Sequence, residues 1–241
     1  DPVVLTGKST RRILFVGGSD PEMGAGLQMD TRMAGVVGCE CISVSTSETF
    51  QDKDGLHSVE PTPIVAFQES LARAFSHDLD AIKTGAMATD AHVKCLAEFL
   101  DLYPGIPLVV DPVGAATKTA KPDAVLLTAA GKAAMVRLLF PQATVVTPNL
   151  FEYADGYDYA QCKAVYLKGG HGADPDLVVD VLIEDGLETA RLEHPRIAGA
   201  TAIHGTGCAL GSLMACALSQ GLELRESVRQ VKTQLIRFLE S

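Results

Sequence analysis

The chain has 241 residues, of which 47% are hydrophobic and 21% are charged, as is typical of a soluble globular protein. Its formal net charge of −10 argues against nucleic acid or an anionic membrane surface as the main partner. No apolar run approaches the roughly eighteen residues that a membrane-spanning helix requires, so we expect no membrane partner either.

Short β-rich runs alternate with stretches of helical spacing along the chain. The pattern predicts strands over 11–20, 39–50, 79–85, 106–113, 143–149 and 163–172, then a hairpin over 176–193. It predicts helices over 25–38, 61–77, 89–103 and 122–141, and two more that begin near Gly205 and Glu223. Such alternation implies β-α-β crossovers and a mainly parallel sheet covered on both faces, within one domain of residues 1–241.

The connection over residues 150–162 is short for a crossover between two parallel strands. Two explanations stay open: a true deletion, or a place where the printed sequence lacks a segment.

Polar residues and glycines gather where the predicted strands end. Ligands of parallel sheets bind beyond the carboxyl ends of the strands, so these clusters predict a site at that edge. The clusters are Gly17-Gly18-Ser19-Asp20, Lys83-Thr84-Gly85, Asp111-Pro112, Thr147-Pro148-Asn149 and Lys168-Gly169-Gly170-His171.

The turn Gly205-Thr206-Gly207-Cys208 opens an apolar helix. The first amides of a helix lack intrahelical partners, and the helix dipole adds positive charge, so this terminus suits an anion such as phosphate. A thiol placed there has a stabilised thiolate and can serve as a base or nucleophile. The alternative is a small residue that merely fills the first turn of a packed helix.

Three other polar motifs each allow a functional and a structural interpretation. The carboxylate of Asp111, at a strand exit, suits Mg²⁺ or a phosphate-bound water, or else caps a turn. Asn149 and Glu152, three residues apart, can hold Mg²⁺ beside phosphates, or form an N-cap with a first-turn glutamate. The glycine-rich stretch 17–26 lacks the P-loop and dinucleotide patterns. It leaves Asp20 and Asp30 as acceptors for a ligand, or is a plain strand-to-helix turn.

The six cysteines, at positions 39, 41, 95, 162, 208 and 216, form no C-x-x-C pair and no zinc spacing with histidine. Most of them lie in apolar stretches, where cysteine is usually a small buried hydrophobe. This usage, with no signal-peptide pattern at the start, predicts a reducing, cytoplasmic location.

Seven stretches in order resemble the hydroxymethylpyrimidine/phosphomethylpyrimidine kinases of thiamine biosynthesis, within the ribokinase-like superfamily. They cover nearly the whole chain, and the ordered set is specific although no single motif is. The stretches are GGSDPEMGAGLQMD, SETFQDKDGLHSVEP, AIKTGAM, VVDPV, TPNLFE, LKGGHG and HGTGCALGS.

The resemblance implies a three-layer α/β/α ribokinase-like fold with a mainly parallel central sheet, a homodimer, and the use of ATP with Mg²⁺. It implies that Cys208 is the base that takes the hydroxyl proton, while the amides of Gly205, Thr206 and Gly207 neutralise the transferring phosphoryl group. The other residues that it assigns are Gly18, Asp30, Gln51 and Val113 for the pyrimidine, Lys168, Asn149 and Thr147 for the nucleotide, and Asp111 and Glu152 for the metal.

Some positions depart from the family pattern. Glu22-Met23 replaces a Ser-Gly pair, Ala86 replaces a methionine, and Gly114 opens a stretch in which the expected lysine shifts to Lys118 or Lys121. These changes concern the substrate more than the phosphoryl machinery. They leave two alternatives: a pyridoxal or pyridoxine kinase of the same superfamily, and a domain that senses a pyrimidine phosphate without catalysis.

Overall fold

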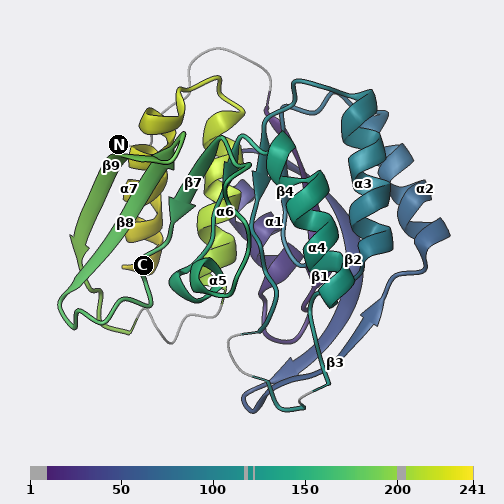
Figure 1. Cartoon of the computed structure of the whole chain (residues 1–241), viewed down its shortest axis with the longest axis horizontal. Helices are drawn as coiled ribbons and strands as arrows, with labels where there is room; N and C mark the ends of the chain where they lie inside the picture. The colour runs from purple at the N-terminus through teal and green to yellow at the C-terminus, as the bar shows by residue number, and fades with distance from the viewer. Residues whose placement is uncertain (1–9, 117–118, 122, 200–204, 241) are drawn as a thin grey trace.

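One continuous sheet of nine strands organises the part of the chain that the computed structural model describes, residues 10–116, 119–121, 123–199 and 205–240 (Figure 1). The strand order is β3-β2-β1-β4-β5-β6-β7-β8-β9. The strands are β1 (Arg12–Ser19), β2 (Glu40–Asp52), β3 (Gly55–Pro61), β4 (Ala81–Thr84), β5 (Leu108–Val110), β6 (Val145–Val146), β7 (Ala164–Leu167), β8 (Leu177–Glu184) and β9 (Leu187–Pro195).

The centre of the sheet is parallel and its two margins are antiparallel. Strands β2, β1, β4, β5, β6 and β7 pair in parallel, in that spatial order. At one margin β3 folds back on β2, and at the other β8 and β9 form a hairpin beside β7. The parallel strands therefore bring their carboxyl ends to one edge, as the sequence predicted.

Helices cover both faces of the sheet (Figure 1). Apolar side chains of α2, α3 and α4 build the core on one face, and those of α1, α6 and α7 build the core on the other. The helices are α1 (Gly26–Val36), α2 (Ile64–Phe75), α3 (Asp90–Leu102), α4 (Ala129–Leu138), α5 (Leu150–Ala154), α6 (Thr206–Leu218) and α7 (Leu224–Leu239), with a 3-10 turn η1 (Phe140–Gln142). None of these helices is long and apolar enough to cross a membrane.

Two predicted elements need correction. The helix expected from residue 122 begins only at Ala129, with the Thr128 side chain as its N-cap. The preceding residues are extended instead, because Leu126 and Thr128 exchange backbone hydrogen bonds with Ala88. The sequence also missed β3, which pairs with the end of β2 through a tight turn in which Gly55 has φ = +121°.

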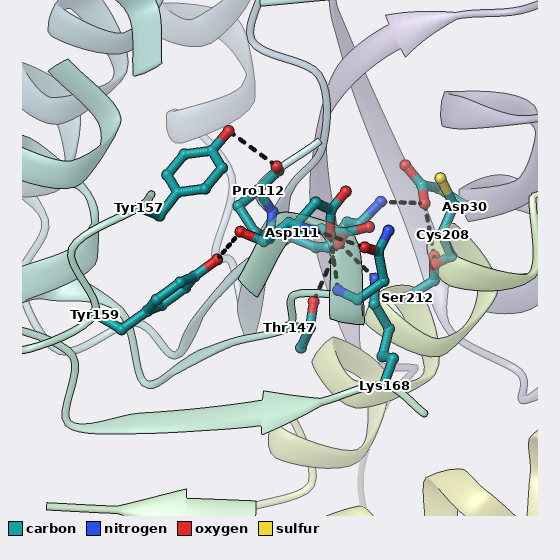
Figure 2. Close-up of polar contacts among 12 residues, drawn as sticks. Asp30, Asp111, Pro112, Thr147, Tyr157, Tyr159, Lys168, Cys208 and Ser212 are labelled. Carbon is teal, nitrogen blue, oxygen red and sulfur yellow. Dashed lines mark hydrogen bonds and ion pairs between the residues drawn. The ribbon is translucent and has the colours of Figure 1, made fainter. Parts of the chain in front are cut away.

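The connection between β6 and β7 contains only the five-residue helix α5. In place of a long crossover helix, Tyr157 and Tyr159 pack their rings on Phe140, with centroids 5.8 and 5.4 Å away. The Tyr157 hydroxyl donates to the Pro112 carbonyl oxygen at 3.1 Å (Figure 2). The short connection thus seals one core and also fixes the backbone just after Asp111.

Candidate functional site

A cavity of about 580 Å³ lies at the carboxyl edge of the parallel strands. Of the predicted site residues, only Thr147 does not line it. The lining includes Gly18, Asp30, Gln51, Asp111, Val113, Asn149, Glu152, Lys168 and residues 205–208. The strand exits and the glycine-rich helix start therefore meet in one place, as sheet topology predicted.

The helix α6 presents its amino terminus to this cavity. Gly205 is the N-cap residue with φ = +83°, and a Cβ there would lie only 3.3 Å from Ala25 Cα and from Met29 Cε. Glycine thus allows α1 and α6 to approach closely. The first intrahelical hydrogen bond runs from the Ala209 amide to the Gly205 carbonyl at 2.9 Å. The amides of residues 206–208 precede it, so they are available to an anion.

Cys208 lies in the first turn of α6, and its thiol is beside the carboxylate of Asp30 from α1 (Figure 2). Its pKa is raised, first because burial disfavours the thiolate and then because Asp111 and Asp30 add negative charge. Lys83 and Lys168 lower the pKa of the thiol but do not outweigh burial. The expectation of a thiolate stabilised by the helix terminus is therefore wrong. Desolvation has the larger effect.

Asp30 forms a buried ion pair with Lys83. Lys83 Nζ, on β4, lies 2.8 Å from Asp30 Oδ1, and both side chains are only 1% exposed. The Ser212 hydroxyl donates to the same oxygen at 2.6 Å. Burial lowers the pKa of Lys83, but Asp30, Cys208 and Asp111 raise it by more, so the lysine is charged.

The sequence placed Lys83 in a strand-exit cluster of the predicted site but did not give it a specific role. A lysine inside an apolar strand cannot reach water, so it requires a carboxylate partner in the core.

A second ion pair lies nearer the amino terminus of α6, beside Gly207. Lys168 Nζ contacts Asp111 Oδ1 at 2.8 Å, and the Thr147 hydroxyl donates to the same oxygen at 3.4 Å (Figure 2). Thr147 is fully buried, so it orients Asp111 and does not line the cavity. Within the described chain, the other carboxylate oxygen of Asp111, Oδ2, is buried without a hydrogen-bond partner.

Asn149 and Glu152 form a capping box at the start of α5. The Asn149 side chain accepts from the Glu152 amide at 2.9 Å, and the Glu152 carboxylate accepts from the Asn149 amide at 2.8 Å. Burial, with a contribution from Asp111, raises the pKa of Glu152 to about 7, although Lys168 and the Asn149 amide lower it. The structural interpretation of this motif is thus confirmed, and the carboxylate still lines the cavity.

The donor set around Asp111 fits a magnesium ion held mainly by its substrate. No group of three or more His, Cys, Asp or Glu residues among the described positions could enclose a metal. Mg²⁺ usually keeps several waters and takes one or two carboxylates together with substrate phosphates. The unpartnered oxygen of Asp111 and the carboxylate of Glu152 meet that requirement.

Small side chains line the part of the cavity near β1 and β2. A Cβ on Gly18 would lie 3.3 Å from Ser47 Oγ and 3.7 Å from Ala86 Cβ. Gly18 and Ala86 are therefore neighbouring residues with little side-chain volume at this part of the cavity. Gln51 lies just after an irregularity in the β2–β3 pairing and is almost fully buried. Val113 completes this end of the cavity.

Asp20 and the two candidate lysines of the phosphate loop remain to be placed. The carboxylate of Asp20 accepts from the amides of Met23 and Ala25, at 3.2 and 3.1 Å, so it holds its own loop. Of the two lysines considered for the phosphate loop, Lys118 lies outside the described residues and Lys121 is exposed.

Comparison with known proteins shows the family of this chain. The family model for phosphomethylpyrimidine kinase matches residues 20–159 and 155–240, and the two matches meet in the short connection after α5. A hydroxymethylpyrimidine/phosphomethylpyrimidine kinase of Streptomyces coelicolor is 36% identical, over 91% of this chain and 85% of its own length. The corresponding enzyme of Haemophilus influenzae is 31% identical, over 93% and 89%.

A solved structure extends the comparison to the fold. The pyridoxal kinase of Staphylococcus aureus, in complex with AMP-PCP and pyridoxal, superposes with a TM-score of 0.80 at 27% identity. The match covers 95% of this chain and 87% of that one. The ribokinase-like α/β/α fold expected from the sequence is thus confirmed. The chain belongs to the phosphomethylpyrimidine kinase family.

Proposed function

We propose that this protein transfers the γ-phosphoryl group of ATP to the hydroxymethyl group of 4-amino-5-hydroxymethyl-2-methylpyrimidine, to the phosphate of its monophosphate, or to both. The observation that carries the proposal is the meeting of the residue 205–208 turn with Lys168, Asp111 and Glu152 in one cavity. The names of the relatives from Streptomyces coelicolor and Haemophilus influenzae support the choice of substrate.

Phosphoryl transfer depends mostly on positioning and on neutralising the charge of the phosphoryl oxygens. In our proposal the amides at the start of α6 face those oxygens, and Lys168 faces the nucleotide phosphates. Asp111 and Glu152 would hold Mg²⁺, which, when bound, neutralises phosphate charge. Asn149 fixes the backbone at the start of α5, beside Glu152, through its capping box.

Cys208 is the proposed base. As the substrate oxygen bonds to the γ-phosphorus and the bond to ADP breaks, the hydroxyl proton passes to the sulfur. This requires a thiolate, whereas burial raises the pKa of the Cys208 thiol. The pH profile of kcat/KM reports groups of the free enzyme, so its ascending limb should extend above the ordinary range of a cysteine.

At the other end of the cavity, Gln51 offers a donor and an acceptor to the ring nitrogen and the amino group. Asp30, Gly18 and Val113 form the adjoining walls.

The test is ADP release with ATP and Mg²⁺, comparing the pyrimidine, its monophosphate and pyridoxal, for the wild type and Cys208→Ala. Turnover of a pyrimidine that collapses in the variant supports both the substrate and the base. Undiminished turnover in the variant removes the role of Cys208.

Two outcomes favour the alternatives. A clear preference for pyridoxal favours the activity named for the structural neighbour of Staphylococcus aureus. Tight pyrimidine binding without ADP release favours a sensing domain. We also propose the homodimer and the cytoplasmic location on the family resemblance, and light scattering tests the first.

A further inference from the structure

A buried carboxylate outside the proposed reaction residues reaches the loop that carries Lys168. Asp180, on β8, is 2% exposed. Its Oδ1 accepts from the Gly169 amide at 2.7 Å. Its Oδ2 accepts from the Tyr166 hydroxyl at 2.8 Å and from the Lys232 ammonium of α7. The end of β7 with its following loop, and the middle of α7, thus converge on one side chain.

At Gly169, the loop after β7 packs closely against the backbone of Val179 in β8. A Cβ on Gly169 would lie 1.8 Å from the Val179 carbonyl oxygen, so only glycine fits where the chain leaves β7. With the Gly169 amide bonded to Asp180 and its α-carbon against Val179, the backbone at this residue is held from two directions.

The side chain fixed by this crossing is Lys168, one residue earlier. Its Nζ contacts Asp111 Oδ1 at 2.8 Å, and a Cβ on Gly207 would lie 3.3 Å from that nitrogen. Lys168 therefore contacts the carboxylate at the β5 exit and lies close to the residue 205–208 turn of α6. A small displacement of its backbone would change both distances.

A guanidinium holds the other half of the same loop. Arg196 donates to the carbonyl oxygens of Gly170 at 2.8 Å, Gly172 at 3.1 Å and Asp174 at 2.9 Å. The loop after β7 thus donates a hydrogen bond to Asp180 from its Gly169 amide. Its carbonyl oxygens accept hydrogen bonds from Arg196, which is nearer the surface.

Lys232 and Tyr166 compensate for the burial of the Asp180 carboxylate by an ion pair and a hydrogen bond. Both are almost fully buried, and Lys232 supplies the cation that a carboxylate in the core requires. The pair also ties α7 to the loop, because Lys232 lies in the middle of that helix.

We infer that Asp180 is a positioning residue, which fixes the Gly169 amide and thereby aims Lys168 at the nucleotide phosphates. Lys232 and Tyr166 hold Asp180 in this orientation through their contacts with its other carboxylate oxygen. The inference rests on the proposed function for its ligand, a nucleoside triphosphate.

The test compares Asp180→Asn with Glu184→Gln, a matched control. Glu184 lies on the same strand and pairs with Arg225 and Thr189, away from the loop. We expect Asp180→Asn to lower kcat/KM for ATP by about 10- to 100-fold, as for the loss of other supporting contacts. The KM for the acceptor should stay unchanged, and the control should leave both constants unchanged.

A double-mutant cycle separates positioning from a general loss of structure. In a Lys168→Met background, Asp180→Asn should have no further effect on kcat/KM, because its target has been removed. Tyr166→Phe, which removes one hydrogen bond and keeps the packing, should give a smaller loss with the same dependence on Lys168. It decides the question if Asp180→Asn does not fold.

Hydrogen exchange of the segment 168–172 gives a readout that needs no acceptor substrate. Faster exchange in Asp180→Asn than in the control is expected. Additive effects of Asp180 and Lys168, or unchanged exchange together with unchanged kinetics, would overturn the inference. If the wild type phosphorylates none of the acceptors, the proposed function fails, and the exchange data alone decide the role of Asp180.

Discussion

Replacing Lys83 by methionine keeps most of the side-chain volume but leaves the Asp30 carboxylate buried without its cation. The two side chains are each 1% exposed, and their charged atoms are 2.8 Å apart. The Ser212 donor remains on Oδ1 of Asp30, whereas Oδ2 is buried without a hydrogen-bond partner in the described structure. Breaking one side of such a pair costs about 3–5 kcal/mol.

Protonation of Asp30 sets an upper limit on this cost. With an ordinary pKa of about 4, protonating an aspartate costs about 4 kcal/mol at pH 7 and about 1.4 kcal/mol at pH 5. In the variant, the folded state has the higher pKa for Asp30, so it binds more protons than the unfolded state in this range. The free energy of unfolding therefore falls as pH rises through the window. The loss relative to wild type should be up to about 2.7 kcal/mol larger at pH 7 than at pH 5.

Urea unfolding at pH 5, 6 and 7 measures this difference. The double variant Asp30→Asn/Lys83→Met has no buried charge at these two positions, so it should be more stable than Lys83→Met at pH 7 and show no added pH dependence. A loss for Lys83→Met that is equal at pH 5 and pH 7, or below about 1 kcal/mol, would refute the reasoning.

Three further predictions concern other walls of the cavity. Glu152→Gln keeps a capping-box residue and removes a carboxylate whose pKa is raised to about 7, so its Tm should exceed that of the wild type at pH 8, and the gain should vanish near pH 4.5. Gly26→Ala places a Cβ 2.2 Å from the Gly18 carbonyl oxygen at φ = +55°, so urea unfolding should show a loss of at least about 1–3 kcal/mol, with weaker acceptor binding. Ala86→Met fills space beside Gly18, so the ratio of kcat/KM for the pyrimidine to that for the bulkier pyridoxal should rise.

The arrangement of the site could be predicted because topology determines it. Once a parallel sheet is recognised, every strand exit lies on the same edge, so Asp111 and Lys168 must lie close together whatever the details of packing. The turn before Cys208 reaches the same cavity. Local pattern also offered the Asn149–Glu152 capping box as one of two interpretations, since its partners are only three residues apart.

The remainder depends on contacts between distant segments. Asp180 and Lys232 are 52 residues apart, and neither lies in a recognisable motif. The pKa of Cys208 depends on how deeply α6 packs, and sequence spacing does not report burial. The late start of α4 has a similar cause, because hydrogen bonds to Ala88 hold the preceding residues extended despite their helical composition.

The two ion pairs explain why α6 needs glycine at two positions. A Cβ on Gly211 would lie 3.2 Å from Lys83 Cε, and one on Gly207 would lie 3.3 Å from Lys168 Nζ. The two glycines are four residues apart, so they share a helix face, and each lysine approaches that face at one of them. Cys208 lies between these approaches, where both lysines favour the thiolate while Asp30 and Asp111 oppose it. Since each cation is paired with a carboxylate, burial has the largest effect, and the pKa of the Cys208 thiol is raised.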